Sequence, residues 1–125
     1  MITYRYNSQV DPPAPFVLVT VKTEDGSHVS QFPALIDTAA DLSAVPMTII
    51  ERLQLVSVSD AVVRAFGSDP EIRPIYLVNI QVHDRQAIDV EVLGDPVNRH
   101  IILGRDILNH FRLVLDGPNQ RLELE

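Results

Sequence analysis

Apolar and polar positions alternate over most of the chain, with the two-residue period that is typical of half-buried strands. The segment Phe16–Thr23 is rich in β-branched residues and predicts a strand. A turn is expected at residues 24–26 and a second strand from about Ser27 to Ile36. The segment Ala87–Leu93 alternates most cleanly, with acids between apolar residues. These patterns predict a mainly β domain.

The remaining elements follow from the same period and from breaker residues. Gly67–Pro70 and 117–120 have turn composition, and Gly94–Pro96 is expected to end the strand before it. Apolar residues three and four apart predict a short helix over Pro46–Leu55, and Arg105–His110 fits one or two helical turns. Further strands are expected at Val56–Phe66, Ile75–Val82, His100–Leu103, Phe111–Asp116 and Arg121–Glu125.

The N-terminal residues differ from the rest in composition. Asp11–Pro15 is too rich in proline for a helix or a central strand, so residues 1–15 are expected to form an extended arm. Residues 16–125 then form one domain, as a chain of 125 residues suggests. The terminal strand Arg121–Glu125 is expected to offer an open edge for pairing with another subunit.

Composition removes several classes of function. The chain has no cysteine, which excludes disulfides, thiolate metal sites and cysteine nucleophiles. Its 10 Lys and Arg against 17 Asp and Glu give a net charge of −7, which opposes binding to nucleic acid. No apolar run approaches the ~18 residues of a membrane helix, and the first residues lack a signal-peptide profile. A cytoplasmic protein without membrane contact is expected.

One acidic residue stands where a strand is expected to end. Asp37 directly follows the apolar strand, and Thr38, Ala39 and Ala40 come after it. Small residues let backbone N–H groups approach a carboxylate, so this segment alone favours an ordinary turn cap. Ser43 lacks the context of a nucleophile and is expected to support the loop.

A second segment, about sixty residues later, changes this interpretation. It reads Ile102-Leu103-Gly104-Arg105-Asp106. With the Asp37 loop, it resembles the retropepsin-like aspartic proteases, over roughly Phe16 to Glu125. In that family an Asp-Thr/Ser-Gly loop carries the catalytic acid, and two apolar residues and a glycine cross beneath it before a short helix. The resemblance implies a closed β-barrel with one or two short helices.

The resemblance also implies roles for the loop residues. Asp37 would be the catalytic acid, and a chain with only one such loop implies a homodimer in which two copies of Asp37 share a proton. The Thr38 hydroxyl would bond across the dimer axis. Asp41 would contact the substrate backbone and form a partly buried ion pair with Arg105. The substrate would be a peptide or protein, and no cofactor is implied.

The resemblance places the flap, the hairpin that closes over the substrate, at Phe66, Gly67, Ser68 and Asp69. Gly67 could supply hinge freedom or could be an ordinary turn glycine. No metal is expected, because the four histidines are scattered without ligand spacing.

The chain departs from the family pattern at one position. Ala39 stands where the family has glycine, beside the carboxylate. Two functions therefore stay open: an aspartic endopeptidase, favoured by Asp37, Thr38 and Asp41, or a weakly active or inactive module for dimerisation or peptide binding, favoured by Ala39. A β domain that binds an unrelated small molecule is a third, weaker possibility.

Overall fold

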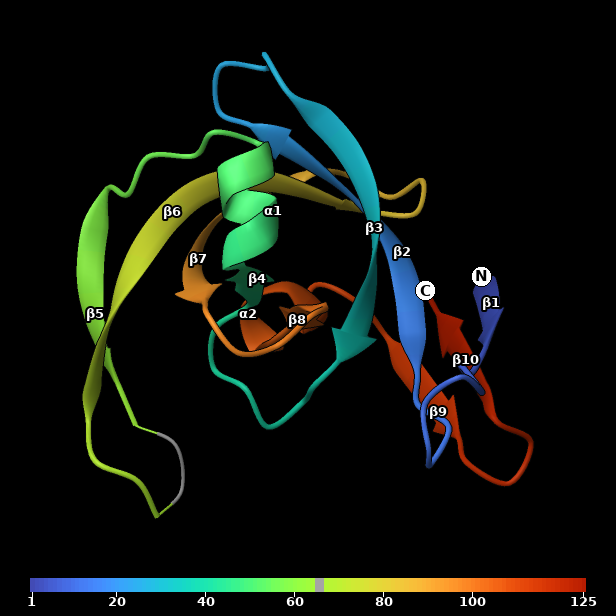
Figure 1. Cartoon of the computed structure of the whole chain (residues 1–125). Coiled ribbons are helices and arrows are strands. Elements are labelled where there is room, and N and C mark those ends of the chain that lie inside the picture. The colour runs from blue at the N-terminus through green and yellow to red at the C-terminus, as the bar shows by residue number, and fades with distance from the viewer. Residues whose placement is uncertain (65–66) are drawn as a thin grey trace.

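The computed structural model describes residues 1–64 and 67–125, and this part of the chain is mainly β, as predicted (Figure 1). Its helices are α1 (Met47–Arg52) and α2 (Arg105–Leu108). Its strands are β1 (Ile2–Arg5), β2 (Phe16–Thr23), β3 (Val29–Ile36), β4 (Ala44–Pro46), β5 (Ser59–Val63), β6 (Glu71–Val82), β7 (Ile88–Asp95), β8 (Ile101–Leu103), β9 (Leu113–Asp116) and β10 (Arg121–Leu124).

Strands β2 to β8, except β5, close into a barrel. Their order is β2-β3-β8-β4-β7-β6, and β6 pairs back onto β2 to complete the ring. The β3–β8 and β4–β7 pairs are parallel, whereas the other pairs of the ring are antiparallel. β5 pairs with the outer half of β6 and forms a hairpin that projects from the ring (Figure 1). The barrel predicted from the resemblance is confirmed.

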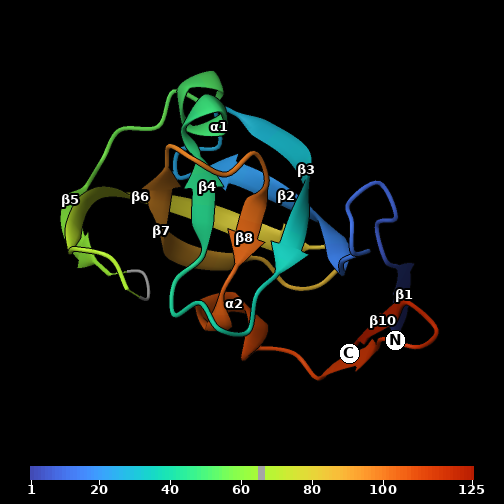
Figure 2. The same ribbon diagram turned by 60° about the horizontal axis from the view of Figure 1, so that its bottom comes forward.

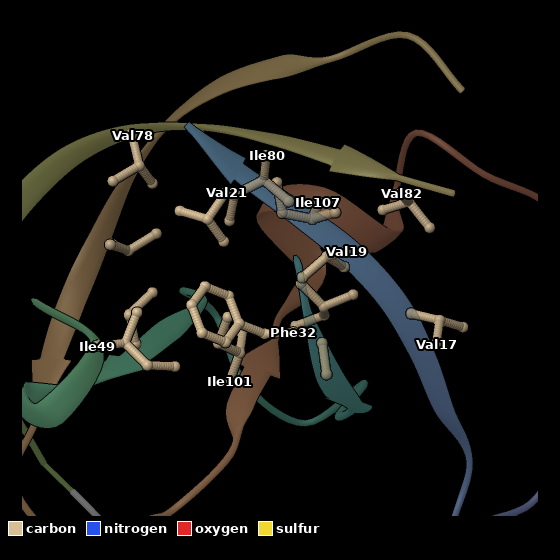
Figure 3. Packing of buried hydrophobic residues seen from close by; sticks show 14 of the residues in the cluster. Val17, Val19, Val21, Phe32, Ile49, Val78, Ile80, Val82, Ile101 and Ile107 are labelled. Atoms are coloured by element: carbon tan, nitrogen blue, oxygen red, sulfur yellow. The ribbon is translucent and has the colours of Figure 1, made fainter. Parts of the chain in front are cut away.

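The barrel is filled by one face of each strand. In β2, Val17, Val19 and Val21 are almost fully buried, while Leu18 and Lys22 face outward. Figure 3 shows these valines meeting side chains from β3, β6, β8 and both helices in one cluster. Burial of each such aliphatic side chain contributes roughly 1.5–3 kcal/mol. The alternating pattern in the sequence therefore reports the inner and outer faces of the barrel.

The first helix is shorter than predicted. A helix was expected over Pro46–Leu55, but α1 begins at Met47 because Pro46 has extended backbone angles and is the last residue of β4. The helix ends at Arg52, since Gln54 adopts a left-handed conformation with φ of 56°. Ile49 and Ile50 are buried against the core, which explains the apolar spacing in the sequence.

The expectation that Gly94 ends its strand is wrong. β7 continues through Gly94 to Asp95, in parallel with β4. A Cβ on Gly94 would lie 2.9 Å from both the Met47 sulfur and a Tyr76 ring carbon, so this glycine permits close packing rather than a turn. The strand β4 itself escaped prediction, because three residues are too few to show a period.

Strand boundaries around the hairpin also differ from expectation. The strand expected over Val56–Phe66 is reduced to β5, Ser59–Val63, and Val56 and Val58 are largely exposed in the segment before it. β6 begins at Glu71, earlier than predicted, because the hairpin ladder pairs Val63 with Glu71. The β-branched residues of the 56–58 segment therefore gave a false strand signal.

A second sheet of three strands lies beside the barrel (Figure 2). Residues Ile2–Arg5 of the expected arm form β1, and the order is β1-β10-β9. The prediction that the terminal strand offers an open edge is wrong, because β10 is the central strand and pairs on both sides. The outer edges of this sheet belong to β1 and β9.

Among the described residues, no helix is long and apolar enough to span a membrane.

Candidate active site

The Asp37 loop begins where β3 leaves the barrel. The backbone N–H of Asp37 donates to the Leu103 carbonyl oxygen at 3.0 Å, so β8 holds the start of the loop. The half-buried Asp37 carboxylate accepts the backbone N–H of Ala39 at 3.0 Å, and the Asp37 carbonyl accepts that of Ala40 at 3.2 Å. The loop thus turns tightly around the carboxylate and leaves its second oxygen for other partners.

A buried hydrogen-bond network fastens the far end of this loop to α2. The Ser43 hydroxyl donates to the Asp106 carboxylate at 2.7 Å, and the Ser43 backbone N–H donates to its other oxygen at 2.9 Å. The same hydroxyl accepts the Gly104 N–H at 3.0 Å. Ser43 is fully buried and Asp106 is partly buried, so the Ser43 end of the network is shielded from water. Ser43 supports the loop, as expected.

Asp106 is a structural residue that sequence reasoning missed. Its carboxylate accepts three hydrogen bonds: two from Ser43 and one from the Ile107 N–H at 2.9 Å. The signal in the sequence was an acid in the first turn of a short helix, where carboxylates commonly cap backbone amides. That pattern predicts a local cap, but not the bonds to a residue sixty-three positions away.

Arg105 ties the outside of the loop together. Its guanidinium donates to the Thr38 carbonyl oxygen at 2.8 Å and forms an ion pair with Asp41. The pairing of Asp41 with Arg105 agrees with the resemblance. The expectation that it is partly buried is wrong: the Asp41 side chain is 84% exposed and that of Arg105 is 43% exposed. The pair lies on the solvent side of the loop, where an ion pair contributes little to stability.

Gly104 has a clear steric role beneath the loop. A Cβ there would lie 2.8 Å from the Leu42 carbonyl carbon and 2.9 Å from the Ala40 carbonyl oxygen, both of which are backbone atoms. No side chain can be added without displacing the loop. Its neighbours Ile102 and Leu103 belong to β8, which pairs in parallel with β3. Glycine is therefore required here for close backbone approach.

Ala39 fits its position without backbone strain. It is exposed, and it is not among the residues with positive φ. Its N–H donates to the Asp37 carboxylate, as the N–H of a glycine at this position would. The methyl group therefore leaves the loop conformation and its hydrogen bond to the acid intact.

The expected flap coincides with the β5–β6 hairpin. Phe66 lies outside the described residues, whereas Gly67, Ser68 and Asp69 are exposed at the tip. Gly67 has φ of 77°, and a Cβ there would meet no atom within 4 Å. The turn itself therefore accounts for this glycine. The hairpin tip and the Asp37 loop lie toward the same end of the barrel (Figure 1).

A groove of about 360 Å³ lies between the hairpin and the loop. Asp37 is part of its wall. The other lining residues are mostly apolar: Ala40, Leu42, Ala44, Val63, Leu93, Gly94, Val97 and Ile102, with Arg64, Arg73, Asp95 and Asn98 as polar members. An apolar groove with a few polar groups beside a carboxylate is the usual form of a ligand site.

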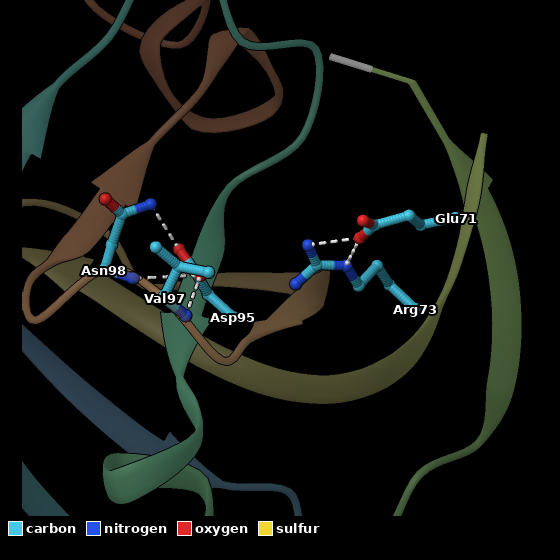
Figure 4. Close-up of polar contacts among 5 residues, drawn as sticks. All are labelled: Glu71, Arg73, Asp95, Val97 and Asn98. Carbon is cyan, nitrogen blue, oxygen red and sulfur yellow. Dashed lines mark hydrogen bonds and ion pairs between the residues drawn. The ribbon is translucent and has the colours of Figure 1, made fainter. Parts of the chain in front are cut away.

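Asp95 shapes the rim of this groove. Its carboxylate accepts the N–H groups of Val97 and Asn98 and the Asn98 side-chain amide, at 2.9, 3.1 and 2.7 Å (Figure 4). Burial alone would raise the pKa of Asp95, but these hydrogen bonds hold the pKa below its ordinary value. The charged carboxylate fixes the turn that presents Val97 at the groove. Sequence reasoning missed this role, since it treated residues 94–96 as a break.

Within the described part of the chain, no group of three histidine, aspartate or glutamate side chains is arranged to hold a metal ion.

Comparison with known proteins agrees with this geometry. The family model for gag-polyprotein putative aspartyl protease matches residues 26–110, which is more than half of the chain. That span holds the Asp37 loop, the hairpin and the Gly104 segment. No curated protein matches.

Solved structures share the fold at low sequence identity. A retropepsin-like aspartic protease from Rickettsia conorii aligns with a TM-score of 0.69 and 12% identity, over 98% of this chain and 88% of the other. The EIAV protease complexed with the inhibitor HBY-793 aligns with a TM-score of 0.52 and 20% identity, over 86% and 93%.

A foamy viral protease-reverse transcriptase, in complex with an RNA/DNA hybrid, aligns with a TM-score of 0.56 and 14% identity over 78% of this chain. The alignment spans only 12% of that longer protein. The barrel, the loop geometry and the family match lead to one conclusion: the chain belongs to the gag-polyprotein putative aspartyl protease family, among the retropepsin-like aspartic proteases.

Proposed function

We propose that this chain is an aspartic endopeptidase that works as a homodimer, with Asp37 of each subunit at a shared active site. The observation that carries the proposal is the Asp37 carboxylate on a loop fastened to the core, in the wall of an apolar groove beneath a hairpin. A groove of this form suits an extended peptide. Because each chain has one such loop, a pair of carboxylates requires two chains.

The chemistry follows from like-charge repulsion. Two carboxylates about 3 Å apart cannot both ionise cheaply, so the pair would share one proton in its active form, as in aspartic proteases in general. The ionised Asp37 would take a proton from a water molecule, which attacks the scissile carbonyl carbon. The protonated Asp37 would donate to the carbonyl oxygen, and a proton would pass to the leaving amine as the C–N bond breaks.

The second sheet suggests which edge joins the subunits. β10 is enclosed, so a pairing of strands between subunits through this sheet would use β1 or β9. β9 carries Val114 and Leu115, which are 38% and 45% exposed and belong to an edge strand without a basic residue or a proline. Such an edge is open to pairing with another strand. We assign β9 to the subunit contact.

The assignment of β9 to the subunit contact can be tested by introducing one positive charge on this strand. In Val114→Lys, the subunit contact would gain one positive charge from each chain, while Glu123 lies opposite on β10 and keeps the monomer stable. Light scattering at micromolar concentration should show a monomer for this variant and a dimer for the wild type. Thr3→Lys on β1 is the control and should stay dimeric. A dimeric Val114→Lys, or a monomeric wild type, contradicts the assignment.

Ala39 supports a second candidate, a weakly active or inactive module that binds peptides. Ala39 is exposed and its N–H bonds the Asp37 carboxylate, so its methyl group adds bulk close to the acid that a glycine would not. Cleavage of an unbiased peptide library at acidic and neutral pH separates the two functions, with Asp37→Asn as the control. Binding without cleavage by a confirmed dimer would favour the module.

A cytoplasmic location stays a prediction.

A further inference from the structure

The groove beside Asp37 contains two cations. Arg64 follows β5, and Arg73 lies on β6, so both come from the hairpin. The chain has only 10 lysines and arginines and a net charge of −7. Two guanidinium groups in one groove therefore form a local concentration of positive charge on an acidic protein. Both line a wall that is otherwise largely apolar.

Two of the three guanidinium nitrogens of Arg73 donate hydrogen bonds to Glu71. Its Nε and Nη2 donate to the same oxygen of Glu71, at 3.0 and 2.6 Å. The Arg73 side chain is 22% exposed and that of Glu71 is 60% exposed, so this pair lies near the surface and contributes little. In Figure 4 the remaining guanidinium nitrogen lies on the side turned away from Glu71, toward the Val97–Asn98 turn.

The acids around this groove do not use up the two cations. The Asp95 carboxylate accepts three hydrogen bonds from its own turn, and the charge of Arg73 acts on it only through space, as the smallest of the influences that lower its pKa. Asp37 accepts a bond from its own loop. Glu71 is the acid that pairs with Arg73, and no ion pair of Arg64 occurs among the described residues. Guanidinium donors therefore remain available to a ligand.

We propose that this groove selects peptides that carry an aspartate or glutamate two positions from an aliphatic residue. Arginine binds carboxylates through two parallel hydrogen bonds, which gives both strength and direction. Leu42, Ala44 and Ile102 would receive the aliphatic side chain. Side chains two positions apart in an extended peptide point to the same face, so one groove can take both. The inference rests on the proposed function, because it assigns the substrate class of the same groove.

The test measures binding without cleavage. The Asp37→Asn variant is titrated into two labelled peptides that differ only in Glu against Gln, placed two positions from a leucine. We expect the Glu peptide to bind about tenfold more tightly, because a charge-assisted pair is roughly twice as strong as a neutral hydrogen bond. Adding Arg64→Gln and Arg73→Gln should bring the ratio close to one. Lys22→Gln, on the exposed side of β2, is the control, and this variant should keep the tenfold preference for the Glu peptide.

The results separate this inference from the proposed function. Equal affinity for both peptides, no binding of either, or a preference that survives loss of both arginines overturns the inference. If the wild type cleaves the Glu and Gln peptides equally well, the peptidase assignment stands and the inference fails. If the wild type cleaves neither these peptides nor any member of the unbiased library, but the Asp37→Asn variant prefers Glu, the acidic selectivity stands and the peptidase assignment fails.

Discussion

The floor and the roof of the groove are built differently. The floor consists of residues 37–43, Gly104 and α2. The Asp37 N–H donates to the Leu103 carbonyl oxygen of β8, and the Ser43 carbonyl oxygen accepts the Leu93 N–H of β7, while Ser43 bonds Asp106 and Gly104 within the floor. The roof, the β5–β6 hairpin, projects from the ring, and β5 pairs with β6 alone in the described part of the chain. Regions with few buried contacts open at low free-energy cost, whereas core elements open only with the whole domain. The proposed endopeptidase must admit a peptide chain, and an acid held by the core beneath a hairpin with one pairing partner suits that task.

The largest effect is expected from Gly104→Ala in the floor. The new methyl group would lie under 3 Å from backbone atoms of Ala40 and Leu42 and would force the loop to move. Overpacking of this kind lowers the free energy of unfolding by about 1–3 kcal/mol. Thermal unfolding should show a melting temperature several degrees lower, and peptidase activity should be lost with the loop geometry.

The same substitution in the roof is the control. In Gly67→Ala the methyl group meets no atom, so the cost comes from the positive φ alone and falls on a hairpin that can relax locally. The melting temperature should change much less than in Gly104→Ala. A larger loss of stability from Gly67→Ala than from Gly104→Ala would refute the distinction between floor and roof.

A loss of stability of similar size is expected from Asp106→Ala, which removes the acceptor for the Ser43 hydroxyl and backbone N–H. Leaving these buried donors without a partner costs about 1–3 kcal/mol. Urea unfolding measures this loss. Asp69→Ala makes the same chemical change at the exposed hairpin tip, where a substitution should stay within about 0.5 kcal/mol. Equal losses in the two variants would mean that the Ser43–Asp106 network does not hold the floor.

The smallest effect on stability is expected from Ala39→Gly. Since Ala39 does not have positive φ, glycine relieves no strain and only adds freedom to the unfolded chain. The free energy of unfolding should fall by about 0.4–1 kcal/mol. If the wild type is weakly active, kcat/KM should rise, because the methyl group stands beside the reacting carboxylate. Unchanged kcat/KM in a robustly active protein would show that the methyl group is harmless.

The sequence predicted the strands of the barrel better than the hydrogen bonds and close contacts that hold its loops. Alternation over Phe16–Thr23 gave a strand with correct bounds, since each inward residue is buried. Gly94 was misjudged because a glycine required by packing looks the same in sequence as one that breaks a strand. The bonds of Ser43 and Asp95 were missed because they depend on backbone turns and on residues far along the chain. The enclosure of β10 by β1 could not be seen from a short terminal pattern.

If Asp37 is the catalytic acid of the proposed endopeptidase, its carboxylate is indispensable, and kcat/KM of wild type and Asp37→Asn on one cleaved peptide measures this. Asparagine keeps an oxygen that can accept the Ala39 N–H, so the variant should fold and should remain a dimer by light scattering. We expect kcat/KM to fall by at least about a thousandfold, because the variant has no carboxylate to take up a proton. Activity at the wild-type level in a folded, dimeric Asp37→Asn would contradict this expectation.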